Sequence, residues 1–293
     1  MSHRKLLDQL LSEPALIKAP GVYDGLSALL VEQAEFNCAF LSGGSLAFSR
    51  FGRPDMGLVC ASEVAEAVRV IRDRSALPLI VDMDAGFGNS LNVQRTVRDL
   101  ERAGASALQL EDQVSPKRCG HMKGKAVISA VEMQGKIRAA QDAKEHDSTL
   151  LIARTDALGV NGFEDAMERA ALYLEAGADA LFIEAPAEIS QMQAIGKEFG
   201  ARVPLIHNLV EGGNSPVVDV ETLQHLGYKI ALYPVALLHT FVPAARKILD
   251  EIRNTGSTEN LRQNMIDLTQ MNTLLGADSL IADGEKYDGG ANS

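Results

Sequence analysis

Two aspartates lie within an otherwise apolar run of the sequence, LIVDMD, where Asp82 and Asp84 are separated by one residue. If the run is a β-strand, both carboxylates point to the same side. They would repel one another unless a cation lay between them, and oxygen ligands without a nearby histidine favour Mg²⁺ or Mn²⁺ over Zn²⁺. With Glu111 arriving from the next strand, the pattern predicts a metal site. The alternative is a buried network neutralised by Arg154 or Lys117.

A basic segment, SPKRCGHMKGK at residues 115–125, stands out in this acidic chain. No acidic residue occurs between Asp112 and Glu132. A basic loop with two glycines, directly after a strand and above acidic residues, predicts a lid that captures a small anionic substrate. Neighbouring cations lower the pKa of a thiol, so Cys119 is expected to be reactive rather than a buried apolar residue.

The composition excludes several classes of protein. The 293 residues carry 39 acidic and 28 basic side chains, a net charge of −11, which argues against nucleic acid and anionic membranes as partners. No apolar run reaches the ~18 residues of a membrane span, and no secretion signal is visible, so a cytoplasmic protein is expected. Three scattered cysteines do not form a disulfide framework. We expect Cys38 and Cys60 to be buried.

Eight short apolar runs predict buried parallel strands. They lie near residues 16–19, 38–42, 78–83, 107–111, 149–153, 179–183, 203–207 and 229–233. Amphipathic stretches between them predict helices, at 62–73, 91–103, 129–143, 162–176 and 188–198. The alternation predicts one (β/α)₈ barrel domain over residues 1–293, with the barrel at about 14–250 and C-terminal helices and a tail at 251–293. An open doubly wound sheet is the alternative, but no glycine-rich phosphate turn follows an early strand.

Polar residues follow almost every predicted strand, where a barrel builds its active site. They are Asp24, Ser42 to Gly44, Asp82 to Asp84, Glu111 and Asp112, Arg154 to Asp156, Glu184, Asn208 with Glu211, and Tyr233. Helix capping is an alternative explanation for Asp24, Asp112 and Asp156, because aspartate often begins helices. Capping does not explain Asp82, which lies inside a strand.

Five segments resemble the isocitrate lyase / phosphoenolpyruvate mutase superfamily. They are SGG (42–44), VDMDAGFGN (81–89), QLEDQVSPKRCGHMKGK (109–125), IARTDA (152–157) and IEAP (183–186). The KRCGH stretch is similar to the signature of the carbon–carbon lyase branch. The resemblance covers about residues 8–250. It implies a (β/α)₈ barrel whose last barrel helix is exchanged between subunits, usually in a homotetramer.

The resemblance also implies roles for individual residues. Asp84 would bind Mg²⁺, or Mn²⁺ in its place, with Asp82 and Glu111 assisting partly through water. Cys119 would be the general acid. The other residues on the closing lid would be Lys117, Gly120 and His121.

The remaining implied roles concern the substrate. Ser42, Gly43 and Gly44 would bind the carboxylate of a 2-oxo acid, assisted by Arg154. Asp55 would belong to a second loop near the substrate. The second carboxylate would be bound or supported by Glu184, Asn208, Glu211 and Ser215.

The implied reaction is a Claisen-type cleavage of a 2-hydroxy di- or tricarboxylate, of the 2-methylmalate type, into an α-oxo acid such as pyruvate and a carboxylate. Methylisocitrate lyases carry arginine after the lid histidine, where this chain has Met122, and the stretch NLVEGGNSP is more similar to 2,3-dimethylmalate lyase. The alternatives are an oxaloacetate decarboxylase or acetylhydrolase and a phosphonate C–P enzyme, which Cys119 and Pro234 disfavour. A catalytically silent barrel with a role in assembly is a further alternative.

Overall fold

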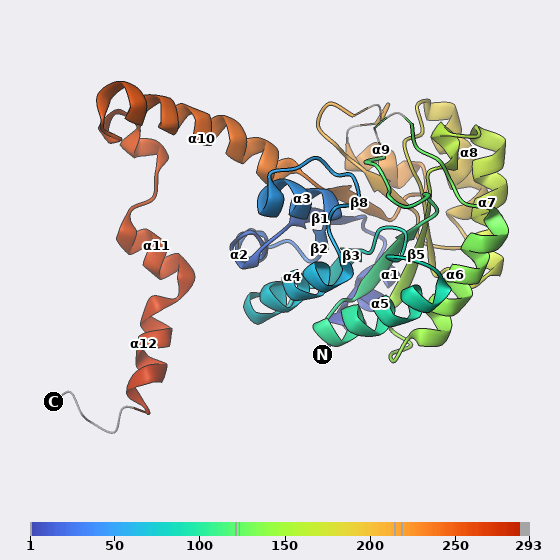
Figure 1. The fold of residues 1–293 in the computed structure, drawn as a ribbon, viewed down its shortest axis with the longest axis horizontal. Coiled ribbons are helices and arrows are strands. Elements are labelled where there is room, and N and C mark those ends of the chain that lie inside the picture. Colours follow the sequence, from blue (N-terminus) through green and yellow to red (C-terminus); the bar gives the residue numbers. More distant parts are fainter. Residues whose placement is uncertain (1, 121, 123, 214, 218, 288–293) are drawn as a thin grey trace. The chain divides into compact units, whose positions relative to one another are not determined.

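Eight parallel strands form the centre of the computed structural model, which describes residues 2–120, 122, 124–213, 215–217 and 219–287 (Figure 1). The strands are β1 (Ile17–Val22), β2 (Ala39–Leu41), β3 (Leu79–Asp82), β4 (Ala107–Glu111), β5 (Leu150–Thr155), β6 (Ala180–Ile183), β7 (Ile206–Asn208) and β8 (Ile230–Tyr233). Their order is β6-β5-β4-β3-β2-β1-β8-β7, and a parallel bridge between Leu181 and Leu205 brings β6 beside the start of β7. The predicted (β/α)₈ barrel is therefore confirmed.

Helices connect successive strands and cover the outside of the barrel, and further helices precede the first strand and follow the last in the chain (Figure 1). They are α1 (His3–Ser12), α2 (Gly25–Gln33), α3 (Gly43–Phe51), α4 (Ala61–Arg74), α5 (Ser90–Ala103), α6 (Ala130–Ala143), α7 (Phe163–Glu175), α8 (Ile189–Phe199), α9 (Val220–His225), α10 (Ala236–Thr255), α11 (Leu268–Leu275) and α12 (Ala277–Glu285). Helices α4 to α8 lie at or close to their predicted positions. The sequence did not predict α3, because its start, SGGS, is typical of a loop. Ser42 begins this helix by accepting a hydrogen bond from the backbone N–H of Ser45.

The chain divides into two compact units, Met1–His239 and Thr240–Ser293. The first contains the barrel. The second contains most of α10 together with α11 and α12, and neither α11 nor α12 buries a residue. Leu268 and Leu280 are 76% and 67% exposed. In the part of the chain that the structure describes, no helix has the length and apolarity needed to cross a membrane.

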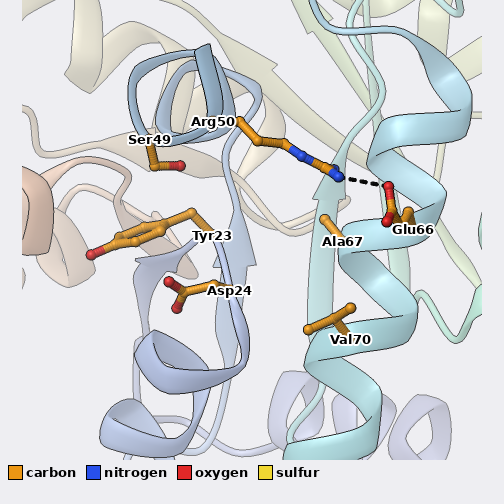
Figure 2. Close-up of a pocket in the computed structure, with 7 residues that line it drawn as sticks. All are labelled: Tyr23, Asp24, Ser49, Arg50, Glu66, Ala67 and Val70. Carbon is orange, nitrogen blue, oxygen red and sulfur yellow. Dashed lines mark hydrogen bonds and ion pairs between the residues drawn. The ribbon is translucent and has the colours of Figure 1, made fainter. Parts of the chain in front are cut away.

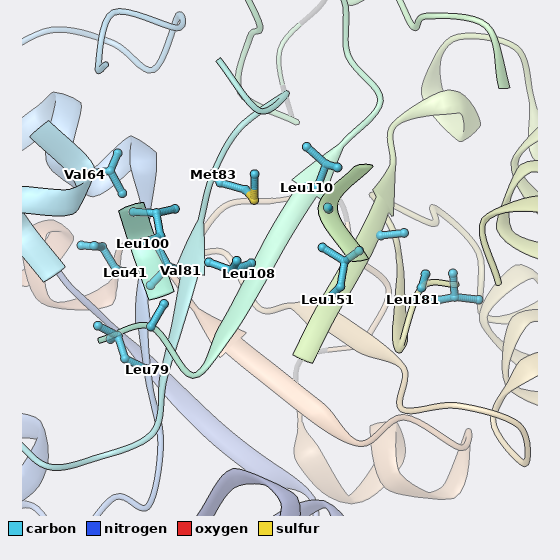
Figure 3. Close-up of a cluster of buried hydrophobic side chains, with 14 of the residues drawn as sticks. Leu41, Val64, Leu79, Val81, Met83, Leu100, Leu108, Leu110, Leu151 and Leu181 are labelled. Carbon is cyan, nitrogen blue, oxygen red and sulfur yellow. The ribbon is translucent and has the colours of Figure 1, made fainter. Parts of the chain in front are cut away.

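Alternation along the strands separates two layers of apolar side chains. In β3, Leu79 and Val81 pack outward with Leu100 of α5 (Figure 3), while Ile80 belongs to a second cluster inside the barrel. This inner cluster also contains Leu7 and Leu10 of α1, together with residues from the starts of several strands. Helix α1 therefore closes the amino-terminal end of the barrel and leaves the opposite end for a site.

Closure by α1 can be tested through Leu7, whose side chain is fully buried. We expect Leu7→Ala to lower the free energy of unfolding by about 2–5 kcal/mol, because it leaves a cavity beneath the strands. Urea denaturation measures the change. The matched control is Gln9→Ala on the exposed side of α1, with an expected change below about 0.5 kcal/mol. Equal effects of the two substitutions would show that α1 does not close the barrel.

Candidate active site

Side chains that point into the barrel change from apolar to polar toward the carboxyl ends of the strands. Ile80 lies in the inner cluster, and Asp82, two residues later, points the same way. The same two-residue spacing leads from apolar to polar side chains in β2, β4, β5, β6 and β7. The side chains placed in this way are Ser42, Glu111, Arg154, Glu184 and Asn208.

One cavity at this end of the barrel collects most of the predicted site residues. Its polar lining consists of Ser42, Gly44, Asp55, Asp82, Lys117, Cys119, Gly120, Arg154, Glu184 and Asn208. Its apolar lining consists of Phe40, Phe48, Val210, Pro234 and Val235. Asp84 and Glu111 lie behind this lining, where they contact Lys117 and Arg154 respectively.

Lys117 joins the basic loop to two carboxylates. Its Nζ lies 2.6 Å from Oδ1 of Asp55 and 2.9 Å from Oδ1 of Asp84, and the side chain is 5% exposed. Burial by itself would lower the pKa of Lys117, but Asp84 and the neighbouring carboxylates raise it well above its ordinary value. The backbone N–H of Cys119 also donates to the Asp55 carbonyl oxygen, at 3.1 Å. The loop is therefore docked on the barrel by a charged lysine.

Arg154 lies at the centre of a second group of carboxylates. Its Nε lies 2.9 Å from Oδ2 of Asp156 and 3.4 Å from Oε2 of Glu111. Its second terminal nitrogen lies 3.2 Å from Oδ1 of Asp156 and 3.8 Å from Oε2 of Glu184. The Asn208 amide in turn donates to Glu184, at 3.2 Å. A bidentate pair with Asp156 fixes the plane of the guanidinium.

Buried carboxyl groups outnumber the buried cations around the cavity. The carboxyl groups belong to Asp55, Asp82, Asp84, Glu111, Asp156 and Glu184, and the described cations beside them are Lys117, Lys125 and Arg154. Burial raises the pKa of Asp84 to about 7 even though Lys117 opposes the shift. Burial likewise raises the pKa of Glu111, although Arg154 opposes it. The site therefore holds more carboxyl groups than its cations neutralise, and the raised pKa values mean that Asp84 and Glu111 take up protons unless a further cation is bound beside them.

A divalent cation fits this surplus of negative charge. Oε1 of Glu111 is buried without a hydrogen-bond partner. Gly43 leaves room beside the two aspartates, because a Cβ there would lie 3.2 Å from Oδ1 of Asp84 and 3.3 Å from Oδ2 of Asp82. Among the residues that the structure describes, no three acidic, histidine or cysteine side chains converge as direct ligands of one ion. Water would therefore complete the coordination, as Mg²⁺ prefers.

Comparison with known proteins identifies the family. The family described as phosphoenolpyruvate phosphomutase matches residues 7–253. The chain belongs to this family. It is 42% identical to a 2-methylisocitrate lyase of Aeropyrum pernix over 273 residues, covering 92% of this chain and 86% of that protein. It is 36% identical to a 2,3-dimethylmalate lyase of Eubacterium barkeri over 272 residues, 93% of each chain. These two relatives are carbon–carbon lyases by name.

Solved structures of the phosphoenolpyruvate phosphomutase and isocitrate lyase superfamily share the fold. An oxaloacetate acetylhydrolase bound to 3,3-difluorooxalacetate has a TM-score of 0.91 and 34% identity, covering 99% of this chain and 98% of that one. A phosphonopyruvate hydrolase in complex with oxalate and Mg²⁺ has a TM-score of 0.88 and 30% identity, and the match covers 98% of this chain and 99% of that one. The resemblance inferred from the sequence motifs is confirmed.

Two of the predicted site residues lie apart from the cavity, and a third is outside the described residues. Glu211 is exposed, with Oε2 at 3.5 Å from Nδ1 of His239. Ser215 Oγ lies 2.7 Å from Nε2 of His207. Glu211 and Ser215 line a neighbouring pocket after β7 rather than the cavity itself. His121 lies outside the described residues.

The capping interpretation is right for one aspartate and wrong for two. Asp24 caps α2 by accepting from the backbone N–H of Ser27 at 2.7 Å. Asp156 instead forms an ion pair with Arg154. Asp112 is fully buried and accepts from the hydroxyl of Tyr173 at 2.7 Å. The Asp156 carboxylate pairs with Arg154, two residues earlier, and with Lys125, and the Asp112 carboxylate pairs with groups far away in the sequence. Neither carboxylate therefore caps a helix.

The three cysteines have different surroundings. Cys38 is buried, as expected, and burial raises the pKa of its thiol to about 12. The expectation that Cys60 is buried was wrong. It is exposed at the start of α4, where its backbone N–H donates to Oε2 of Glu63 at 2.8 Å. Cys119 is partly buried and lines the cavity.

A second pocket lies on the outer surface between α2, α3 and α4 (Figure 2). Its charged side chains include Arg50 and Glu66, which form an ion pair at 2.6 Å and are both solvent-exposed to a third or more. Exposed pairs of this kind contribute little energy. The carboxylates among the described residues that line this pocket, Asp24 and Glu66, are both exposed. The cavity at the strand ends is therefore the candidate active site.

A substitution at Gly120 can test whether the basic loop packs directly against Arg154 and Glu184 at the ends of the strands. A Cβ at this position would lie 2.5 Å from both a terminal nitrogen of Arg154 and Oε1 of Glu184. We expect Gly120→Ala to displace the loop and weaken binding of oxalate, used as a probe with Mg²⁺, by about ten-fold or more, the loss of one charge-assisted contact. Calorimetry measures the affinity. The control is Gly135→Ala in α6, whose Cβ would meet its nearest neighbour at 3.9 Å and should leave affinity unchanged. Wild-type affinity in Gly120→Ala would mean that the loop does not lie on Arg154.

Proposed function

We propose that this protein is a Mg²⁺-dependent carbon–carbon lyase. Its proposed substrate is a small 2-hydroxy dicarboxylate of the 2-methylmalate type, which it cleaves into pyruvate and a second carboxylate. The observation that carries the proposal is the position of Cys119 in a cavity that also contains Arg154, Lys117 and a surplus of carboxylates. The names of the relatives support the same reaction class.

The acidic cluster supplies the proposed metal site. Asp84 would hold the ion directly, and Asp82 and Glu111 would hold it through water. When bound, Mg²⁺ acts as a Lewis acid that polarises oxygen atoms of the substrate. Mn²⁺ shares the preference for oxygen ligands and is expected to replace it.

The remaining steps are carried by residues of the chain. Arg154 would bind the carboxylate of the forming oxo acid and stabilise the negative charge that develops there. The backbone N–H of Gly44, at the start of α3, would contact the same carboxylate. That of Gly43 donates to Oδ2 of Asp82 at 3.3 Å and would reach the substrate only if this bond were exchanged. As the carbon–carbon bond breaks, a base takes the proton of the substrate's 2-hydroxyl group and that oxygen becomes the carbonyl oxygen of the oxo acid. The electron pair of the broken bond stays on the departing carboxylate half as an enolate. The thiol of Cys119 would then donate a proton to that carbon.

The cavity favours a dicarboxylate over a tricarboxylate. Among its described lining residues the cations are Lys117 and Arg154, and both already form ion pairs. Met122 is 39% exposed and lies outside that lining. A third carboxylate without a cation loses a charge-assisted bond of about 1.5–3 kcal/mol. This corresponds to a factor of about 10–150 in specificity. Hydrolysis of oxaloacetate is the second candidate, because an oxaloacetate acetylhydrolase shares the fold at 34% identity.

We also propose that the chain forms a homotetramer with exchange of its C-terminal helices. Within Thr240–Ser293, α11 and α12 bury no residue of their own. The barrel unit has an apolar pocket on its surface, lined in part by Pro20, Leu30, Phe36 and Leu237. Exposed apolar faces of this kind mark sites of protein association.

The proposed role of Cys119 predicts a large loss of turnover on substitution. We expect Cys119→Ser to lower kcat by about 10²–10⁴-fold, because a weaker acid replaces the thiol, with KM largely unchanged. The assay measures pyruvate released from 2,3-dimethylmalate in the presence of Mg²⁺. Cys60→Ser is the matched control, since Cys60 lies on the surface outside the cavity, and it should turn over like the wild type. Near-normal turnover of Cys119→Ser would assign the proton donor to another group.

A further inference from the structure

We infer that Asp156 and Lys125 are positioning residues that orient Arg154 and the Cys119–Gly120 segment together. The inference rests on the proposed lyase function, in which Arg154 and Cys119 act on the same substrate. Neither Asp156 nor Lys125 lines the cavity. They would act through the residues that do.

A continuous set of contacts joins Arg154, at the end of its strand, to the basic loop through the carboxylate of Asp156. Arg154 binds Asp156 through two nitrogens, at 2.9 and 3.2 Å. The Nζ of Lys125 lies 2.7 Å from Oδ1 of the same carboxylate. It also donates to the carbonyl oxygen of Gly120, at 2.5 Å. One carboxylate thus contacts the arginine directly and reaches the residue after Cys119 through a single lysine.

This carboxylate is buried and charged. The side chain of Asp156 is fully buried and that of Lys125 is 6% exposed. Burial would raise the pKa of Asp156, but Arg154 and Lys125 lower it to about 2. The carboxylate is therefore ionised at neutral pH. Removal of either cation would leave this buried charge with a single counter-charge.

Asp156 is itself fixed from below by the network around Asp112. Its backbone N–H donates to Oδ1 of Asp112, at 2.9 Å. The other oxygen of Asp112 accepts from Thr155 and from Tyr173 of α7, both at 2.7 Å. The support for Asp156 thus passes through Asp112, directly after β4, to residues of β5 and α7.

Arg154 needs this support because other acceptors surround it. Oxygens of Glu111 and Glu184 lie 3.4 and 3.8 Å away, farther than those of Asp156. Without Asp156 the guanidinium would turn toward these glutamates and away from the substrate carboxylate. Because the same carboxylate holds Lys125, the orientation of the arginine and the position of the loop depend on one another.

The first test uses a readout that needs no turnover. In the Mg²⁺-loaded protein, the rate at which iodoacetamide alkylates Cys119 is followed by mass spectrometry, with Cys60 as an internal reference for the reagent. Lys125→Met retains much of the aliphatic stem and removes the charge, so Cys119 should react several-fold faster while Cys60 is unchanged. Lys125→Arg should largely restore slow alkylation. Lys197→Met, an exposed lysine on α8, is the control and should behave like the wild type.

The second test asks whether the two residues act through one another. Lys125→Met and Asp156→Asn should each lower kcat/KM at least ten-fold, and the double variant should lose no more than Asp156→Asn alone. Losses that multiply in the double variant would overturn the inference. So would unchanged alkylation in Lys125→Met, even in a protein with full lyase activity. If no lyase product forms but alkylation rises as expected, the proposed reaction fails and the positioning role stands. If Asp156→Asn does not fold, the Lys125→Met and Lys125→Arg pair still decides.

Discussion

The surplus of buried carboxylates at one end of the barrel is the constraint on which the site depends. An ionised carboxylate is costly to bury without a counter-charge. Lys117 therefore extends from the loop to contact Asp55 and Asp84. Arg154 lies among the carboxylates of Glu111, Asp156 and Glu184. The charge that remains suits a divalent cation. The same electrostatic demand thus docks the loop, orients the arginine and prepares the metal site.

Inward-facing side chains recur every two residues along a strand, and those that stabilise the barrel lie at the opposite end from those that line the candidate active site. Inward-facing side chains are apolar near the strand starts, where Leu7 and Leu10 of α1 complete the core. Farther along β2 to β7 they become charged or polar, whereas β1 and β8 continue to Gly21 and Pro234. The division follows the general barrel rule that the carboxyl ends of strands carry function.

Local sequence patterns were sufficient to predict the strands and the polar residues at their carboxyl ends. Continuous apolar runs locate β1 to β8, and Asp82 at the end of β3 lines the cavity. Asp84 follows the end of β3 with a φ of 47°, so it is not on the strand, and it pairs with Lys117 behind the cavity lining. The sequence left open whether a metal or a lysine neutralises them. In the structure Lys117 pairs with Asp84, yet the carboxylates still exceed the cations, so the two explanations are compatible.

Features that depend on distant partners could not be predicted in this way. Asp112 resembles a helix cap in the sequence, but its partner Tyr173 is 61 residues away. Cys60 was expected to be buried because it is apolar, whereas its exposure depends on how α4 packs. The role of Lys125 was hidden among the other charges of the loop, because its partner Asp156 follows a different strand.

The most direct measurement is a comparison of kcat/KM for 2,3-dimethylmalate, methylisocitrate and oxaloacetate, with both products quantified, in Mg²⁺ and in EDTA. The account predicts pyruvate plus a carboxylate from dimethylmalate, with kcat/KM about ten-fold or more above that for methylisocitrate, and no activity in EDTA. Preference for methylisocitrate by about ten-fold would mean that another cation serves a third carboxylate. Full activity in EDTA, or reaction with oxaloacetate alone, would contradict the assignment as a metal-dependent carbon–carbon lyase.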